Sequence, residues 1–105
     1  MKTSLALASL AVAFAAIPAA HAADETALAQ KSGCLACHAV DKKVVGPSYK
    51  EVANKYRGDK AAQAKLEKKV KEGGVGVWGQ IPMPPNAQVA DADIKKLVEW
   101  VLSLK

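Results

Sequence analysis

The stretch Cys34-Leu35-Ala36-Cys37-His38 decides how the rest of this 105-residue chain is interpreted. It has the form C-x-x-C-H, which is the pattern for covalent attachment of a c-type haem. Two thiols three residues apart can lie on one side of a single turn, where both can add to the vinyl groups of one porphyrin. The histidine that follows carries a neutral imidazole nitrogen that can ligate iron. The motif therefore predicts one covalently held haem, with His38 as an axial ligand.

The N-terminus has the three parts of a secretory signal peptide. Lys2 supplies the positive charge, an apolar stretch runs over residues 5–17, and Ala20-His21-Ala22 forms an A-x-A cleavage site. The apolar stretch is shorter than the ~20 residues that span a bilayer. We expect residues 1–22 to be the signal peptide, with cleavage after Ala22 or one residue later. Residues 23–105 then form one exported domain without membrane insertion.

The cysteine pair allows two other interpretations. An exported pair can form a disulfide, but a redox C-x-x-C motif is expected in a βαβ context, and the sequence shows no strand pattern. A structural zinc site needs four ligands, whereas cleavage of the signal leaves only Cys34, Cys37 and His38 among the cysteines and histidines. Both interpretations stay as lesser alternatives to haem attachment.

The net charge of the chain limits the kinds of partner that the sequence predicts. Loss of Lys2 with the signal lowers the formal net charge from +5 to +4, which suits docking to acidic protein surfaces. Arg57 is the only arginine, and no basic run exceeds two residues, so no nucleic-acid partner is predicted. Nothing in the sequence indicates an oligomer, and we expect a monomer.

Hydrophobic periodicity predicts about four short helices and an all-α fold. The first runs over 24–33 with a thin apolar face, the second begins at a Ser48/Glu51 capping box, the third is capped by Asp59 and runs to about residue 72, and the last begins at Asp91 or Asp93. The last is the clearest, and we expect it to cross the first. The predicted buried positions are Ala27 and Leu28; Tyr49, Val52, Ala53 and Tyr56; Ala62, Leu66 and Val70; and Ile94, Leu97, Val98, Val101 and Leu102.

An irregular segment over residues 73–90 contains four glycines and the run Ile81-Pro82-Met83-Pro84-Pro85. A structureless segment of this length in a small domain is usually functional, and its prolines stiffen it. Met83 is the only methionine after the signal, and it lies off any helical stripe. It is therefore the candidate second axial ligand. A His/Met pair raises the reduction potential relative to two histidines.

Three further residues are candidates for the surroundings of the haem. The indole N–H of Trp78 is a donor that suits a haem propionate, with core packing as the close alternative. The Pro47 carbonyl, nine residues after His38, suits the second ring nitrogen of that histidine. Asn86 suits a hydrogen bond near Met83, with turn formation as an equal alternative. The lysines of the third helix include Lys69. They are as compatible with a solvated face as with partner docking or a propionate contact.

These motifs resemble those of the small bacterial class I cytochromes c of the cytochrome c-551/c-552 type, also called cytochrome c8. The resemblance covers the whole chain after the signal. It is carried by Gly33 to Ala39, by Val45-Gly46-Pro47 and above all by Gly76 to Asn86.

The resemblance implies a fold of about four short helices around one haem c. It assigns the thioethers to Cys34 and Cys37, the axial positions to His38 and Met83, and supporting roles to Pro47, Trp78 and Asn86. It also implies a periplasmic electron shuttle rather than an enzyme. Such a shuttle works between an upstream cytochrome or bc1-type complex and a nitrite reductase, a peroxidase or an oxidase. The alternative is a ligand-binding or peroxidatic haem protein with an open or labile distal site, which would need Met83 to be absent from the iron or easily displaced.

Overall fold

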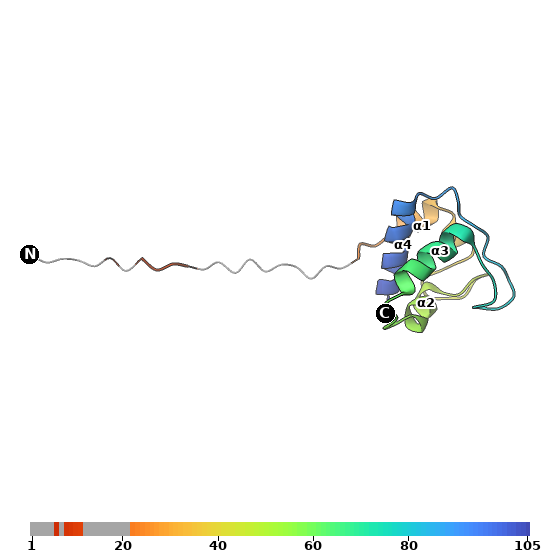
Figure 1. Ribbon diagram of the computed structural model, residues 1–105, viewed down its shortest axis with the longest axis horizontal. Coiled ribbons are helices and arrows are strands. Elements are labelled where there is room, and N and C mark those ends of the chain that lie inside the picture. The colour runs from red at the N-terminus through yellow and green to blue at the C-terminus, as the bar shows by residue number, and fades with distance from the viewer. Residues whose placement is uncertain (1–5, 7, 12–21) are drawn as a thin grey trace, which may run out of the picture.

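The computed structural model describes residues 6, 8–11 and 22–105 (Figure 1). Most of the predicted signal peptide, including Ala20 and His21 of its cleavage site, lies outside the described residues. The elements in chain order are α1 (Thr26–Lys31), the 3-10 turn η1 (Cys34–Ala36), α2 (Tyr49–Lys55), α3 (Ala62–Glu72) and α4 (Asp91–Ser103). The described part contains four α-helices and two isolated β-bridges but no strand, so the predicted all-α fold is confirmed. Its helices also include none long and apolar enough to cross a membrane.

Helix α4 is the centre of the packing, because α1, α2 and α3 all contact it (Figure 1). It begins at Asp91, and its predicted stripe is confirmed: Ile94, Leu97, Val98 and Val101 are buried, and Leu102 is half-buried. Trp100 is also buried, with only 4% of its surface exposed, and it widens the buried side of the helix. The first and last helices, which the sequence predicts to cross, are in contact.

Helix α2 begins as its sequence predicts. The Ser48 hydroxyl accepts from the backbone N–H of Glu51 at 3.1 Å, and the Glu51 carboxylate accepts from the Ser48 N–H at 3.3 Å. This reciprocal capping satisfies two backbone donors that the first turn leaves unpaired. It directs the chain from Pro47 into the helix, so the buried Tyr49 lies at the first helical position.

The first helix is shorter than the sequence predicts. It spans Thr26–Lys31 rather than residues 24–33, and the Asp24 carboxylate accepts from the backbone N–H and the hydroxyl of Thr26 and so lies before the first turn.

Two further details of the sequence prediction are wrong. Helix α3 begins at Ala62 rather than at Asp59, because the Asp59 carboxylate accepts from the Ala61 N–H at 2.8 Å and so caps a preceding turn instead of the helix. On α1, Ala29 is fully buried and Ala27 is exposed. Helix α1 is short, so the side that it buries is decided by where α4 packs against it. The hydrophobic periodicity of α1 itself is too weak to indicate that side.

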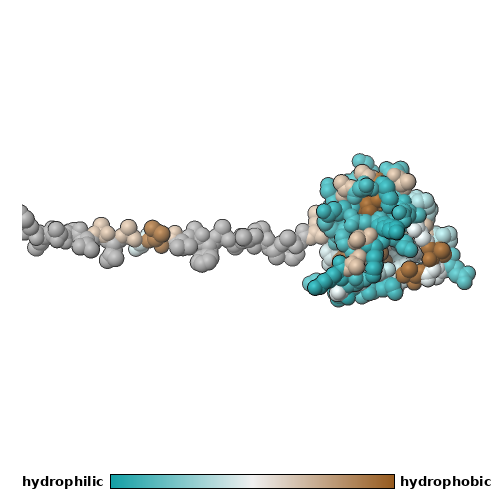
Figure 2. All heavy atoms as spheres, viewed as in Figure 1, coloured by the Kyte–Doolittle hydropathy of each residue, from teal (hydrophilic) through white to brown (hydrophobic). Residues whose placement is uncertain are grey.

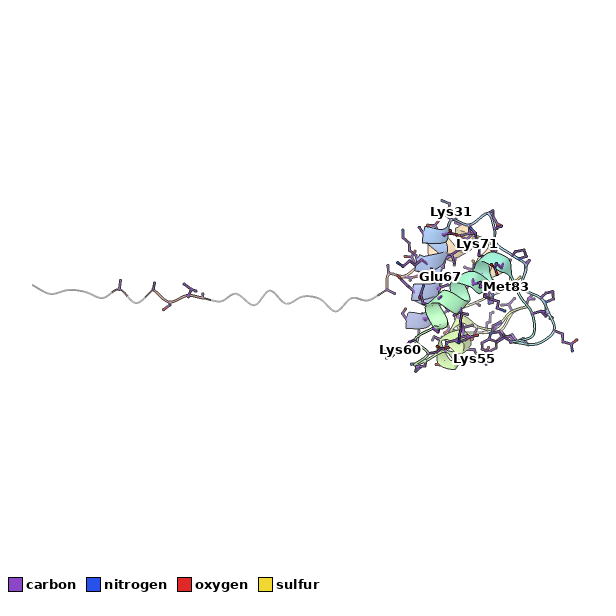
Figure 3. The ribbon with its side chains drawn as sticks, in the orientation of Figure 1. Lys31, Lys55, Lys60, Glu67, Lys71 and Met83 are labelled. Atoms are coloured by element: carbon purple, nitrogen blue, oxygen red, sulfur yellow. The ribbon has the colours of Figure 1, made fainter. Side chains whose placement is uncertain are left out.

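The lysine-rich helix α3 faces solvent on the side shown in Figures 2 and 3, where hydrophilic colour covers most of the surface and Lys60 and Lys71 lie at opposite ends of the helix. Three of its lysines take part in ion pairs, which are Lys65–Asp59 at 3.0 Å, Lys68–Glu72 at 4.0 Å and Lys71–Asp91 at 2.9 Å. These pairs favour the solvated-face interpretation over partner docking for that part of the surface.

Candidate haem site

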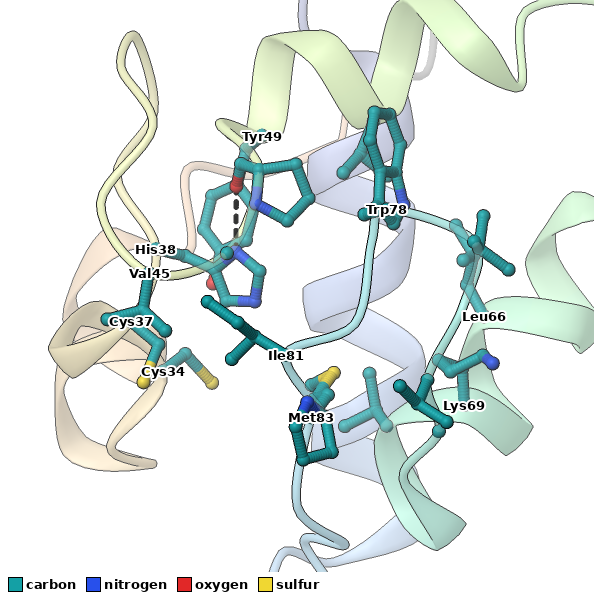
Figure 4. Close-up of a pocket in the computed structure, with 18 of the residues that line it drawn as sticks. Cys34, Cys37, His38, Val45, Tyr49, Leu66, Lys69, Trp78, Ile81 and Met83 are labelled. Carbon is teal, nitrogen blue, oxygen red and sulfur yellow. Dashed lines mark hydrogen bonds between the residues drawn. The ribbon is translucent and has the colours of Figure 1, made fainter.

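Cys34 and Cys37 lie on one tight turn, as their spacing predicts. Gly33 enters the turn with a φ of 81°, a left-handed conformation that favours glycine. The N–H groups of Cys37 and His38 then both donate to the carbonyl of Cys34, at 3.2 and 3.0 Å. Both cysteines are free, half-buried thiols. Burial raises the pKa of the Cys34 thiol above its ordinary value. Figure 4 shows both side chains at the same edge of a cavity.

The imidazole of His38 reaches into the same cavity from the end of this turn. Its Nδ1 lies 2.8 Å from the carbonyl oxygen of Pro47, the partner suggested by the sequence. A carbonyl oxygen only accepts, so Nδ1 carries a proton, and in the neutral imidazole Nε2 is then the nitrogen with the free lone pair. The loop before Pro47 is fixed because the N–H groups of Val45 and Gly46 donate to the Cys37 carbonyl at 3.2 and 2.8 Å. The ring therefore presents a neutral nitrogen in the form that ligates a metal.

Tyr49 supports the histidine ring, a role that the sequence did not reveal. Its ring stacks on the His38 imidazole with centroids 5.1 Å apart and planes 23° from parallel. Trp100 of α4 packs edge-on against the same tyrosine, with centroids 5.5 Å apart. Tyr49 is 7% exposed, and its burial, together with the nearby Cys34 thiol, raises the pKa of its hydroxyl above the ordinary range. The tyrosine stays neutral, in keeping with the packing role preferred for it from the sequence.

Met83 enters the cavity from the segment that follows α3. Its backbone pairs with Gly74 through two hydrogen bonds, from Met83 N–H at 2.8 Å and from Gly74 N–H at 3.0 Å. In Figure 4 its thioether lies on the other side of the cavity from the two cysteines, and in Figure 3 it lies beside α3. The side chain is half-buried. Sequence reasoning placed Met83 on a stiff segment, and the pairing with Gly74 adds the anchor that fixes that segment.

Asn86 ties the same segment to α3. Its side-chain nitrogen donates to the carbonyls of Val70 and Pro84 at 3.1 and 3.2 Å, and its backbone N–H also donates to Val70 at 3.0 Å. Pro84 directly follows Met83 in the chain, so this hydrogen bond lies next to the methionine. Asn86 therefore has a partner beside the methionine, and its contacts hold the backbone on both sides of Pro85.

Trp78 and Lys69 lie on other parts of the cavity wall. Trp78 is 42% exposed, in contrast to the buried Trp100 of α4. The ammonium of Lys55, at the end of α2, lies 5.4 Å from the centre of the indole ring, within the range of a cation–π contact. Lys69 lies against Gly74, the backbone partner of Met83.

The cavity has a volume of about 540 Å³, within the size range of pockets that hold small molecules and cofactors. Its walls offer every group that a covalently attached haem requires: two free thiols, a neutral imidazole nitrogen, a thioether and an apolar lining. Aliphatic side chains line it from two loops and three helices, and those from the helices are Val52, Leu66, Val70, Leu97, Val98 and Val101. Among the residues that the structure describes, no three Cys, His, Asp or Glu side chains cluster as a metal site. The residues present therefore fit a haem.

The cytochrome c family model matches residues 23–105. Cytochrome c-551 of Allochromatium vinosum is 60% identical over 94 residues, covering 89% of this chain and all of its own sequence. Cytochrome c-551 of Pseudomonas aeruginosa is 48% identical over 105 residues, covering all of both chains. The crystal structure of Nitrosomonas europaea cytochrome c552 superposes with a TM-score of 0.73 at 54% identity, covering 75% of this chain and 98% of that one.

Proposed function

The chain belongs to the cytochrome c family, with its small all-α fold and one covalently attached haem c, and we propose that it is a periplasmic electron carrier with His/Met ligation. Cys34 and Cys37 would form the two thioether bonds. His38 and Met83 would occupy the two axial positions. When bound, the haem supplies an iron that exchanges one electron between its Fe(II) and Fe(III) states.

The arrangement of Met83 carries this proposal. A thioether is held beside the cavity by two backbone hydrogen bonds to Gly74, while the imidazole is held by the Pro47 carbonyl. Both side chains are therefore positioned by backbone atoms of the fold. Such preorganisation keeps both ligands in place in either oxidation state, so that little of the protein has to move when an electron is transferred.

The supporting residues have separate tasks. Pro47 holds the His38 ring in one tautomer and raises the basicity of its free nitrogen. Trp78, at the open part of the cavity wall, would donate its indole N–H to a propionate. Asn86 would keep the backbone of the methionine segment in place through its bonds to Val70 and Pro84. The signal peptide predicted over residues 1–22 would deliver the chain to the periplasm.

The side chains near the cavity suit brief docking of a redox partner. Large apolar side chains are exposed on the two loops that line it, and Figure 2 shows a hydrophobic patch on the side where the segment after α3 runs. Lys43, in the cavity wall, and Lys55, over Trp78, add positive charge beside this surface. A partner with an acidic surface, such as an upstream cytochrome or a terminal reductase or oxidase, would be attracted by the lysines and contact the apolar side chains. The exposed apolar residues are Val44, Val45, Val75, Val77, Trp78 and Ile81.

The absorption spectrum tests the proposal most directly. The protein is produced in cells able to attach haem, and its oxidised and reduced spectra are recorded with and without carbon monoxide. We expect a c-type spectrum that has a methionine–iron charge-transfer band in the oxidised protein and that carbon monoxide leaves unchanged in the reduced protein. A spectrum that shifts with carbon monoxide would contradict Met83 ligation and support a ligand-binding protein. Absence of haem would contradict the roles given to Cys34, Cys37 and His38.

A further inference from the structure

Gly46 approaches the His38 ring more closely than any other type of residue could. A Cβ placed on Gly46 would lie 2.5 Å from Cε1 and 2.9 Å from Nδ1 of the imidazole. Carbon atoms at that separation overlap well inside their normal contact distance of about 3.5–4.0 Å. A side chain on Gly46 would therefore have to displace the ring.

The backbone itself does not require glycine at this position. Five other glycines, which are Gly33, Gly58, Gly73, Gly76 and Gly79, have a positive φ, and Gly46 is not among them. Alanine could adopt the backbone conformation of Gly46 without the strain of the left-handed region. The feature that opposes a side chain here is the imidazole of His38.

The Pro47 hydrogen bond alone leaves the ring one degree of freedom. It fixes Nδ1 at 2.8 Å from the carbonyl oxygen, but the ring can still turn about that bond. Tyr49 blocks one face by stacking at 5.1 Å, and Tyr49 is itself held by the buried Trp100. The Gly46 backbone also lies close to the ring, because a Cβ built on it would meet Cε1 at 2.5 Å.

We propose that Gly46 is a positioning residue that sets the plane of the His38 imidazole, by letting the backbone close on Cε1 while Tyr49 supports the ring face. This rests on the proposed role of His38 as an axial ligand. The plane of an axial imidazole, together with the orientation of the second axial ligand, determines how the unpaired electron of Fe(III) is distributed over the porphyrin. Contacts outside the ligand shell thus tune the metal through the orientation of its ligand.

The haem-loaded variant Gly46→Ala tests the proposal, with Lys42→Ala as the control. Lys42 is exposed on the same loop, and its replacement touches no residue of the site. The proton NMR spectrum of the oxidised protein is the readout, because the spread of the haem methyl resonances depends on the orientation of the axial ligands, and the atoms nearest to a Cβ on Gly46 all belong to His38. We expect Gly46→Ala to change the spacing or order of these resonances while the spectrum stays c-type and low-spin. Lys42→Ala should match the unmodified protein. A methyl pattern unchanged in Gly46→Ala would overturn the proposal.

A second pair of variants covers the case in which Gly46→Ala does not accumulate with haem. Tyr49→Leu removes the stacked ring and gives the imidazole room to move, so the double variant Gly46→Ala/Tyr49→Leu should recover the haem-loaded yield of Tyr49→Leu alone. The proposal would be overturned if Gly46→Ala lowered the haem-loaded yield by the same factor in both backgrounds, that is, in the unmodified protein and in Tyr49→Leu. Failure of His38 ligation itself would be distinguishable, because the unmodified protein would then already lack a low-spin c-type spectrum.

Discussion

Gly74 and Met83 are joined through their backbones, each N–H donating to the other's carbonyl, at 3.0 and 2.8 Å. This pairing attaches the methionine directly behind the C-terminus of α3, where Gly73 ends the helix with a φ of 74°. A Cβ on Gly73 would lie 2.5 Å from the Met83 carbonyl oxygen, so the two segments are in close contact. The backbone position of Met83 is therefore set by main-chain bonds, which a change of its side chain leaves intact.

Replacement Met83→Ala should consequently open one axial position without unfolding the domain. We expect loss of the methionine–iron charge-transfer band, new binding of carbon monoxide, and a fall in reduction potential of at least about 0.1 V, within the ≈ 0.8 V range that axial ligands cover. Redox titration and absorption spectroscopy measure all three. Gln88→Ala, exposed on the same segment and outside the cavity lining, is the matched control and should leave the band in place. An unchanged potential in Met83→Ala would mean that another group ligates the iron.

Replacement Asn86→Ala should loosen the methionine segment. It removes the two side-chain hydrogen bonds to Val70 and Pro84, and we expect a loss of about 1–2 kcal/mol in the free energy of unfolding. Denaturant titration measures this, and the charge-transfer band should disappear at a lower denaturant concentration than in the unmodified protein. Asn54→Ala, whose side chain accepts only from the exposed Arg57, is the control and should stay within about 0.5 kcal/mol. Equal stability of the two variants would refute a structural role for Asn86.

Replacement Asp59→Ala should change how stability depends on pH. The Ala61 N–H and the Lys65 ammonium hold the pKa of Asp59 below its usual 3.8, so the ionised form is favoured in the folded state. A group of this kind stabilises the protein above its unfolded-state pKa, and the contribution is lost as pH falls through the lower folded-state pKa. We expect Asp59→Ala to melt at a lower temperature at pH 7, with the difference shrinking below pH 3.8.

Melting curves between pH 7 and pH 2.5 measure this effect. Glu99→Ala, on the exposed side of α4, serves as the control. Its melting temperature should differ little from that of the unmodified protein, and this difference should not shrink below pH 3.8. A difference for Asp59→Ala that is the same at pH 7 and pH 2.5 would show that the Asp59 charge contributes nothing.

Replacement Lys43→Glu should slow electron transfer to an acidic partner. Lys43 lies in the cavity wall beside the exposed Val44 and Val45, whereas Lys95 is exposed on α4. Stopped-flow rates should fall as salt rises for the unmodified protein, because the Debye length shortens to about 8 Å at 0.15 M. We expect Lys43→Glu to lower the second-order rate and weaken its salt dependence more than Lys95→Glu does. Equal effects of the two substitutions would mean that the partner does not dock beside Lys43.

The sequence by itself determined the all-α class, the start of α2, the buried stripe of α4 and the attachment motif for the haem. The C-x-x-C-H spacing, the Ser48/Glu51 capping box and the stripe of α4 are local patterns, in which residues a few positions apart dictate one conformation. The sequence also predicts Met83 as the second axial ligand, because it is the only thioether after the predicted signal and lies between prolines.

The tertiary structure alone decided the contacts between distant segments. The stack of Tyr49 on His38, the pairing of Met83 with Gly74 and the buried side of α1 each join parts of the chain whose own patterns allow several arrangements. Gly46 illustrates the reason. Its backbone is ordinary, and only the fold brings the His38 ring to where a side chain would stand. Close packing depends on the three-dimensional course of the whole chain, and a pattern within one segment does not encode it.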